Sequence, residues 1–150
     1  MKGSKPAAIA VIMGGSLNPK LMGVAEFFPF NDNVLVTVRV SNLMENKSGF
    51  FGLHIHEGES CKGENFGDTK SHYNPQNGEH PNHAGDLPPL LNCDGIAYMT
   101  VLTNRFKITD IIGKTVVIHS DADDFTTQPA GNAGSKIACG VIEKVTFKEN

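Results

Sequence analysis

The sequence lacks any apolar run that approaches the roughly 20 residues of a membrane-spanning helix. It also lacks a basic excess, because 13 Lys and Arg residues face 16 Asp and Glu residues and the formal net charge is −3. This balance offers no electrostatic footprint for nucleic acid or for an anionic membrane surface, so we expect neither as a partner.

The opening residues lack the continuous apolar core of a secretion signal, because Gly and Pro interrupt the segment MKGSKPAAIAVIMGGS. We therefore expect a cytoplasmic protein, although a signal already removed from the chain would leave no trace.

Cysteine is scarce, and its three copies are Cys61, Cys93 and Cys139. They permit one intramolecular disulfide at most, and the sequence alone leaves three possible pairs. A lone disulfide is unusual in a reducing cytosol, so three buried thiols are the simplest interpretation of the cysteines by themselves.

The remaining composition is that of a globular protein. Hydrophobic residues make up 39% and charged residues 19% of the 150 positions, which is enough apolar material for a buried core. The length predicts a single domain over residues 1–150.

Short β-rich runs recur along the chain with turn residues between them. We expect strands at residues 7–13, 23–28, 34–40, 51–56, 95–102, 115–119 and 138–147. The run VLVTVRV alternates strictly, which predicts a buried valine face and a face carrying Arg39 that meets water. This rhythm is typical of an all-β sandwich or barrel.

Two long stretches rich in Gly, Pro, Asn and Asp separate these runs, at residues 57–94 and 120–136. Loops of this length are usually functional or disordered. The first contains three of the six histidines, and the second begins directly after the last histidine, which favours function.

His54 and His56 flank one residue in GLHIHEG. On a strand, residues i and i+2 point to the same side, so both imidazoles can reach one ion. The pattern is weak alone, because half-exposed strand histidines are common.

The segment SHYNPQNGEHPNHAGDLP supplies His72, His80, His83 and Asp86. Three imidazoles and one carboxylate make a tetrahedral set that suits structural zinc. The alternative is a polar loop that happens to be rich in histidine.

His119 ends the run TVVIH and precedes Asp121, Asp123 and Asp124. These carboxylates either form a solvated acidic turn or include one that holds ligand imidazoles in the required tautomer.

Four motifs, LHIHE, HYNP, HAGDLP and GNAGSKIACGVI, resemble in order and spacing those of the copper/zinc superoxide dismutases. The resemblance spans about residues 52–142 and extends weakly into the N-terminal strands. It implies a Greek-key, immunoglobulin-like β-sandwich or flattened barrel with two long functional loops.

Position by position, the resemblance implies a copper site and a zinc site that share one histidine. The implied copper ligands are His54, His56, His72 and His119, and the implied zinc ligands are His72, His80, His83 and Asp86. It also implies that Asp123 links His54 to His80, and that Cys61 and Cys139 form a disulfide. Cys93 matches no motif residue and is most simply a free thiol.

The implied activity is dismutation of superoxide to O₂ and hydrogen peroxide by Cu(II)/Cu(I) cycling, with His72 as a general acid. Where the family motif has an arginine that guides the anion, this chain has Lys136. The charge is kept, and the rigid fork of donors is lost.

The loops depart from the eukaryotic pattern of the family. Four residues separate His56 from Cys61, and residues 120–131 contain no Lys or Arg, which resembles bacterial members. A homodimer is a possible assembly. Ile112 and Gly113 resemble a dimer-contact pair, although they equally fit the entrance to a strand.

Two other functions remain open at this point. A non-catalytic copper or zinc buffer on the same fold would be expected to have lost copper ligands, whereas all are present here. An extracellular adhesion module of immunoglobulin-like architecture would explain the strands alone.

Overall fold

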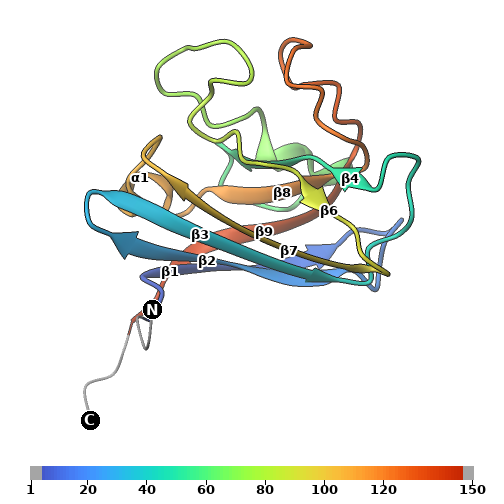
Figure 1. Ribbon diagram of the computed structural model, residues 1–150, viewed down its shortest axis with the longest axis horizontal. Helices are drawn as coiled ribbons and strands as arrows, with labels where there is room; N and C mark the ends of the chain where they lie inside the picture. Colours follow the sequence, from blue (N-terminus) through green and yellow to red (C-terminus); the bar gives the residue numbers. More distant parts are fainter. Residues whose placement is uncertain (1–4, 147–150) are drawn as a thin grey trace.

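The computed structural model describes residues 5–146 (Figure 1). Strands dominate these residues, and the helices are short. The elements in chain order are β1 Ala8–Gly14, β2 Met22–Phe30, β3 Asn33–Ser41, β4 Phe50–Phe51, β5 Leu53–His56, the 3₁₀ helix η1 Glu64–Thr69, β6 Leu90–Leu91, β7 Ile96–Thr103, α1 Ile108–Ile111, β8 Thr115–His119 and β9 Lys136–Lys144.

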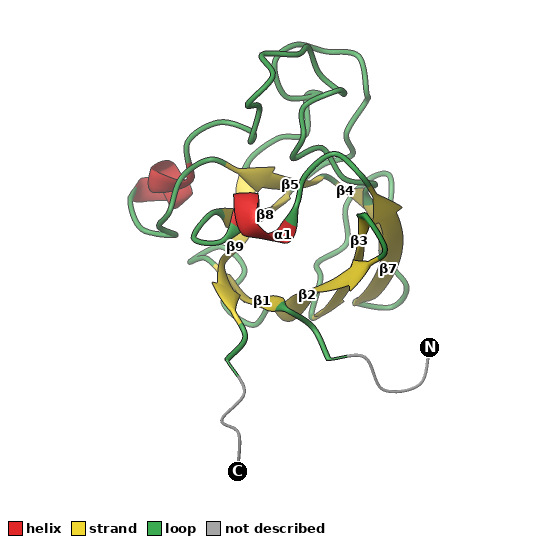
Figure 2. Cartoon of the chain, turned by 90° about the vertical axis from the view of Figure 1, so that its left-hand side faces the viewer, coloured by secondary structure: helices red, strands yellow, loops and turns green. Residues whose placement is uncertain are grey.

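Seven of these strands form one antiparallel sheet in the order β5-β8-β9-β1-β2-β3-β7. The consecutive strands β1, β2 and β3 are neighbours, the last strand β9 lies beside the first strand β1, and β3 pairs with β7 rather than with the strand that follows it in the chain. The sheet curls until it encloses the core, and the short β4–β6 pair lies between its two edge strands, β5 and β7 (Figure 2). The expected all-β flattened barrel is confirmed.

The alternation in β3 works as the sequence predicts. Val34, Val36, Val38 and Val40 are buried, while Arg39 on the opposite face is exposed and bonded to Glu26 of β2 at 3.1 Å. The valines join a core that also contains Phe27 and Ile142 from other strands of the barrel. One apolar face per strand therefore suffices to close the barrel.

Most expected strands are present within two residues of their predicted bounds, and β8 matches exactly. The single strand expected at residues 51–56 is wrong. The chain leaves one sheet and enters another at Gly52, so β4 pairs with β6 and β5 pairs with β8. The last expected strand ends at Lys144, and its predicted final residue, Phe147, lies outside the described residues.

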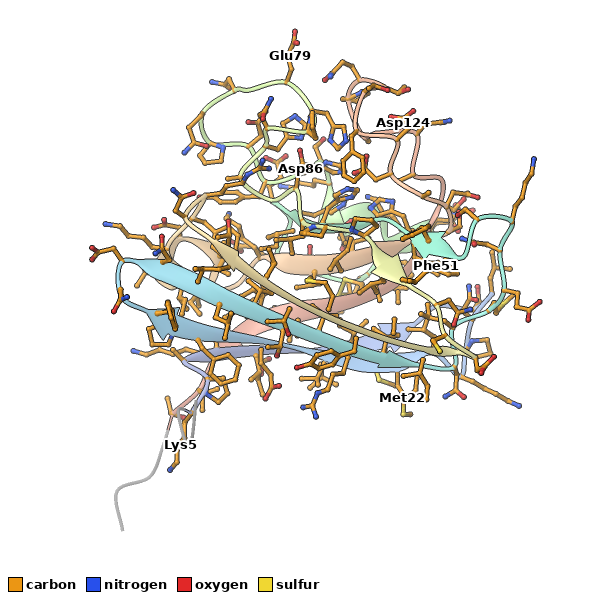
Figure 3. All side chains as sticks on the ribbon, viewed as in Figure 1. Lys5, Met22, Phe51, Glu79, Asp86 and Asp124 are labelled. Atoms are coloured by element: carbon orange, nitrogen blue, oxygen red, sulfur yellow. A yellow bond between two sulfur atoms is a disulfide. The ribbon has the colours of Figure 1, made fainter. Side chains whose placement is uncertain are left out.

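The two long loops rise from the same side of the barrel (Figure 1). Figure 3 shows Asp86 beneath these loops, close to the barrel, and Glu79 at the outer end of the first loop, pointing away. A functional site formed by both loops must therefore lie between them and the strands. Over residues 5–146, no helix is long and apolar enough to cross a membrane.

Candidate metal centre

Strands β5 and β8 bring three histidines together. They pair with His54 opposite Val117, and the backbone N–H of His119 donates to the carbonyl of Gly52 at 2.9 Å. A register shift between Ile118 and His119 in the β8–β9 pairing sets His119 opposite Lys136. Such bulges redirect side chains next to functional sites.

The first loop returns along the free edge of β5. Isolated bridges pair His54 with Asp86 and His56 with His72, and the N–H of Ile55 donates to the carbonyl of Gly85 at 2.8 Å. Backbone pairing therefore fixes the loop against the histidine strand, which explains how residues far apart in sequence meet.

Two groups of four potential ligands result, and in each group one ligand atom per residue lies within 4.8 Å of the others. All seven side chains are buried, and His72 belongs to both groups. The first group is His54, His56, His72 and His119, and the second is His72, His80, His83 and Asp86.

Two histidines of the first group, His56 and His119, donate a hydrogen bond from Nδ1 to a backbone carbonyl. His56 Nδ1 lies 2.8 Å from the carbonyl of Lys70, and His119 Nδ1 lies 3.4 Å from that of Gly134. Each carbonyl requires an N–H, so each Nε2 carries the lone pair, and the two Nε2 atoms face each other at 3.2 Å. Burial lowers the pKa of His56 to about 2 and that of His119 to about 3. Both imidazoles are therefore neutral at physiological pH.

Asp123 lies between the two groups. Its Oδ2 is 2.6 Å from His54 Nε2, and its Oδ1 is 2.8 Å from His80 Nε2. Burial opposes the charge of Asp123, yet the hydrogen bonds from His54, Phe125 N–H and His80 outweigh it and hold the pKa of this carboxyl well below its usual range. The ionised carboxylate accepts both N–H groups and leaves each histidine's Nδ1 for another partner.

His72 has no such outer acceptor. Its Nδ1 lies 2.8 Å from Asp86 Oδ1 and 3.3 Å from His83 Nδ1, inside the second group. Its Nε2, on the side of the first group, makes no hydrogen bond although it is buried. One ring therefore presents a nitrogen to each group.

Three buried histidine nitrogens make no hydrogen bond, and they indicate whether the two groups suit metal ions. They are His54 Nδ1, His72 Nε2 and His80 Nδ1, of which the last lies 3.1 Å from Asp86 Oδ2 within the second group. A buried polar atom normally has a partner, and all three belong to the two groups. Converging neutral imidazoles suit copper, and the addition of a carboxylate in the second group suits zinc. The residues fit the two metals that the sequence suggested.

A pocket of about 460 Å³ opens onto the first group, and its lining includes His56, His72, His119, Lys70 and Lys136. Lys136 Nζ donates to Thr69 Oγ1 at 2.8 Å and to the carbonyl of Lys70 at 2.9 Å. An ammonium has three donors, so one remains for a ligand in the pocket. The geometry provides a cationic group beside the histidines.

Two further contacts hold the first loop in place, one from the second loop and one from β9. Gln128 Nε2 donates to the carbonyl of His80 at 2.7 Å, and the N–H of His80 donates to Gln128 Oε1 at 2.9 Å. Cys61 and Cys139 form the expected disulfide, with Cα atoms 5.7 Å apart, and tie the loop before η1 to β9. Cys93 is a free, exposed cysteine, as expected.

Sequence reasoning missed Lys70 and Gln128. Lys70 adopts φ 59° and ψ −143°, a backbone conformation rare outside glycine, and its carbonyl accepts from both His56 and Lys136. No side-chain signal reveals a backbone acceptor. Gln128, next to Pro129 in the second loop, carries no distinguishing motif.

Comparison with known proteins agrees with this site. The family model described as copper/zinc superoxide dismutase (SODC) matches residues 21–142. The chain is 37% identical over 147 aligned positions to "Superoxide dismutase [Cu-Zn]" of Deinococcus radiodurans, covering 84% of this chain and 79% of that protein. It is 36% identical over 138 positions to "Superoxide dismutase [Cu-Zn] 2" of Aquifex aeolicus, covering 82% and 80%. The chain therefore belongs to the copper/zinc superoxide dismutases, the enzymes that convert superoxide to O₂ and hydrogen peroxide.

Proposed function

We propose that His54, His56, His72 and His119 hold copper and that His72, His80, His83 and Asp86 hold zinc during this reaction. The observation that carries the proposal is the pair of buried four-ligand groups sharing His72. The overall conversion consumes two superoxide anions and two protons and yields one O₂ and one hydrogen peroxide. When bound, copper supplies a one-electron change between Cu(II) and Cu(I), and zinc supplies a fixed positive charge.

His72 handles a proton in this proposal. Its Nδ1 faces Asp86 and His83, while its buried Nε2 faces the first group without a hydrogen bond. While Nε2 is not coordinated it can take up a proton, hold it and donate it to the reduced substrate in the pocket, which is general acid catalysis.

Lys136 binds the substrate anion. Thr69 Oγ1 and the carbonyl of Lys70 fix its ammonium at the pocket wall, and its third donor is available. Lys70 adds a second positive charge to the same lining, opposed by Glu57. Because the whole chain is negative, this local charge is needed to attract an anion.

Ligand variants test the assignment of the two metals. His119→Ala should lose copper and retain zinc, whereas His83→Ala should lose zinc and retain most of the copper. Elemental analysis of purified, reconstituted protein measures both. Loss of neither metal from its assigned variant would refute the ligand sets.

We also propose that the chain functions as one domain and assembles as a homodimer. Ile112 is 37% exposed, and Gly113 leads into β8 with its N–H on the carbonyl of Ile142. Sedimentation equilibrium measures the assembly.

The disulfide favours an oxidising compartment over the cytoplasmic location expected from the sequence, and fractionation of cells tests the location.

A further inference from the structure

Arg105 lies between β7 and α1, outside both ligand groups. Its Nη1 lies within hydrogen-bond distance of three backbone carbonyls of the first loop, those of Pro81 at 2.8 Å, His83 at 3.2 Å and Asp86 at 3.3 Å, which share its two hydrogens. Two of these carbonyls belong to proposed zinc ligands. The guanidinium of Arg105 therefore contacts three carbonyls of a single short turn, residues 81–86.

The turn itself carries most of the second group. It begins after His80 and contains His83 and Asp86, and two internal bonds close it. The N–H of His83 donates to Asp86 Oδ2 at 3.0 Å, and the N–H of Asp86 donates to the carbonyl of His83 at 3.1 Å. These bonds fix the shape of the turn and do not fix its place on the barrel.

Three sets of contacts fix that place. β5 pairs with one side of the loop through the His54–Asp86 bridge, and Gln128 holds His80 from the second loop. Arg105 is the contact from the strand-to-helix connection on the remaining side. Hydrogen bonds from a charged donor are about twice as strong as neutral ones, and guanidinium is a planar, rigid donor.

We propose that Arg105 is a positioning residue that holds the turn carrying His83 and Asp86 in its zinc-binding arrangement before the metal arrives. A ligand set ordered in advance loses less conformational freedom on binding, so its affinity for the ion is higher. The inference rests on the zinc site proposed above and adds a residue that contacts no metal ligand's donor atom.

The sequence offers a matched control, because Arg39 and Arg105 are its only two arginines. Arg39 is exposed on the outer face of β3, pairs with Glu26 of β2 and belongs to neither loop. Zinc affinity is measured by chelator competition on the full chain with its disulfide intact, for the unmodified protein, Arg105→Gln, Arg105→Lys and Arg39→Gln. Copper affinity is measured on the same four proteins.

We expect Arg105→Gln to weaken zinc binding about tenfold and to leave copper affinity within twofold. Arg105→Lys, which keeps one charged donor, should recover part of the loss. Arg39→Gln should match the unmodified protein. Hydrogen exchange of the metal-free proteins should show faster exchange at the backbone amides of residues 82–86 in Arg105→Gln alone.

Three outcomes would overturn the inference: zinc affinity of Arg105→Gln within twofold of the unmodified protein, an equal loss for zinc and copper, or an equal loss in Arg39→Gln. If Arg105→Gln fails to fold, the Arg105→Lys comparison decides in the same way. Failure of the unmodified protein to bind zinc would instead refute the zinc site itself.

Discussion

The carboxylate of Asp123 lies 2.6 Å from Nε2 of His54, and less than a tenth of either residue is exposed to solvent. The same carboxylate reaches His80 at 2.8 Å, so one side chain of the second loop orients a histidine of each ligand group. The two proposed metal sites are therefore coupled through Asp123 as well as through His72.

Asp123→Asn should weaken at least one of the two sites. An amide retains the shape but presents an NH₂ donor to one of two imidazole N–H groups, so that histidine loses its acceptor. Outer contacts of this kind are worth about 10- to 100-fold in metal affinity. We expect a loss of that size for copper or zinc, or for both, measured by chelator competition.

Asp94→Asn is the control for this substitution, because Asp94 is exposed in a turn before β7 and adopts φ 52°, which asparagine tolerates. Unchanged metal affinities in Asp123→Asn, or equal losses in Asp94→Asn, would contradict the coupling.

Gly131 packs directly against this bridge. A Cβ there would lie 2.1 Å from Asp123 Oδ1 and 2.5 Å from His80 Nε2, at φ +67°. Gly131→Ala should displace Asp123 and lower zinc affinity at least tenfold by chelator competition. Gly113→Ala is the matched control, because Gly113 has φ +85° but nothing lies within 4 Å of its Cβ position. It therefore introduces the same backbone strain without a steric clash. An equal loss of zinc affinity in the two variants would show that the clash with Asp123 and His80 is not the cause.

Lys136 should limit capture of the anion. Lys136→Arg restores a fork of donors and should raise the second-order rate on the order of twofold, whereas Lys136→Gln should lower it about tenfold. Pulse radiolysis at several salt concentrations measures both, with metal content checked by elemental analysis. A rate for Lys136→Arg at or below that of the unmodified protein would show that the lysine is not limiting.

The disulfide should be a major source of stability. Cys61 and Cys139 are 78 residues apart, and closing a loop of that size contributes about 4.5 kcal/mol in the chain-entropy account. Cys139→Ser should lower the free energy of unfolding of the metal-free protein by about that amount in urea. Cys93→Ser, which changes an exposed free thiol, should leave it within about 0.5 kcal/mol. Equal stabilities for the two variants would contradict this.

The resemblance to the copper/zinc superoxide dismutases named all seven residues that the structure brings together in the two groups, and local patterns supported part of that expectation. His54 and His56 share a strand face, and the spacing of His80, His83 and Asp86 suits a tight turn. Strand bounds followed from alternation for the same reason. Local sequence patterns therefore predict structure that depends on residues close together in the chain.

The sequence did not predict features that depend on distant partners. The break at Gly52 arises because β4 finds β6 while β5 finds β8, and both choices are made by residues at least 35 positions away. Lys70 acts through its carbonyl, which every residue possesses. Arg105 likewise acts on backbone carbonyls that no motif marks.

Metal stoichiometry measured beside dismutase activity tests the central claim most directly. Elemental analysis of the reconstituted, disulfide-bonded protein should give one copper and one zinc per chain. Activity should disappear when copper is removed by chelation and return when copper is restored. Protein that holds both metals with its disulfide intact, yet dismutates superoxide no faster than free copper, would contradict the account.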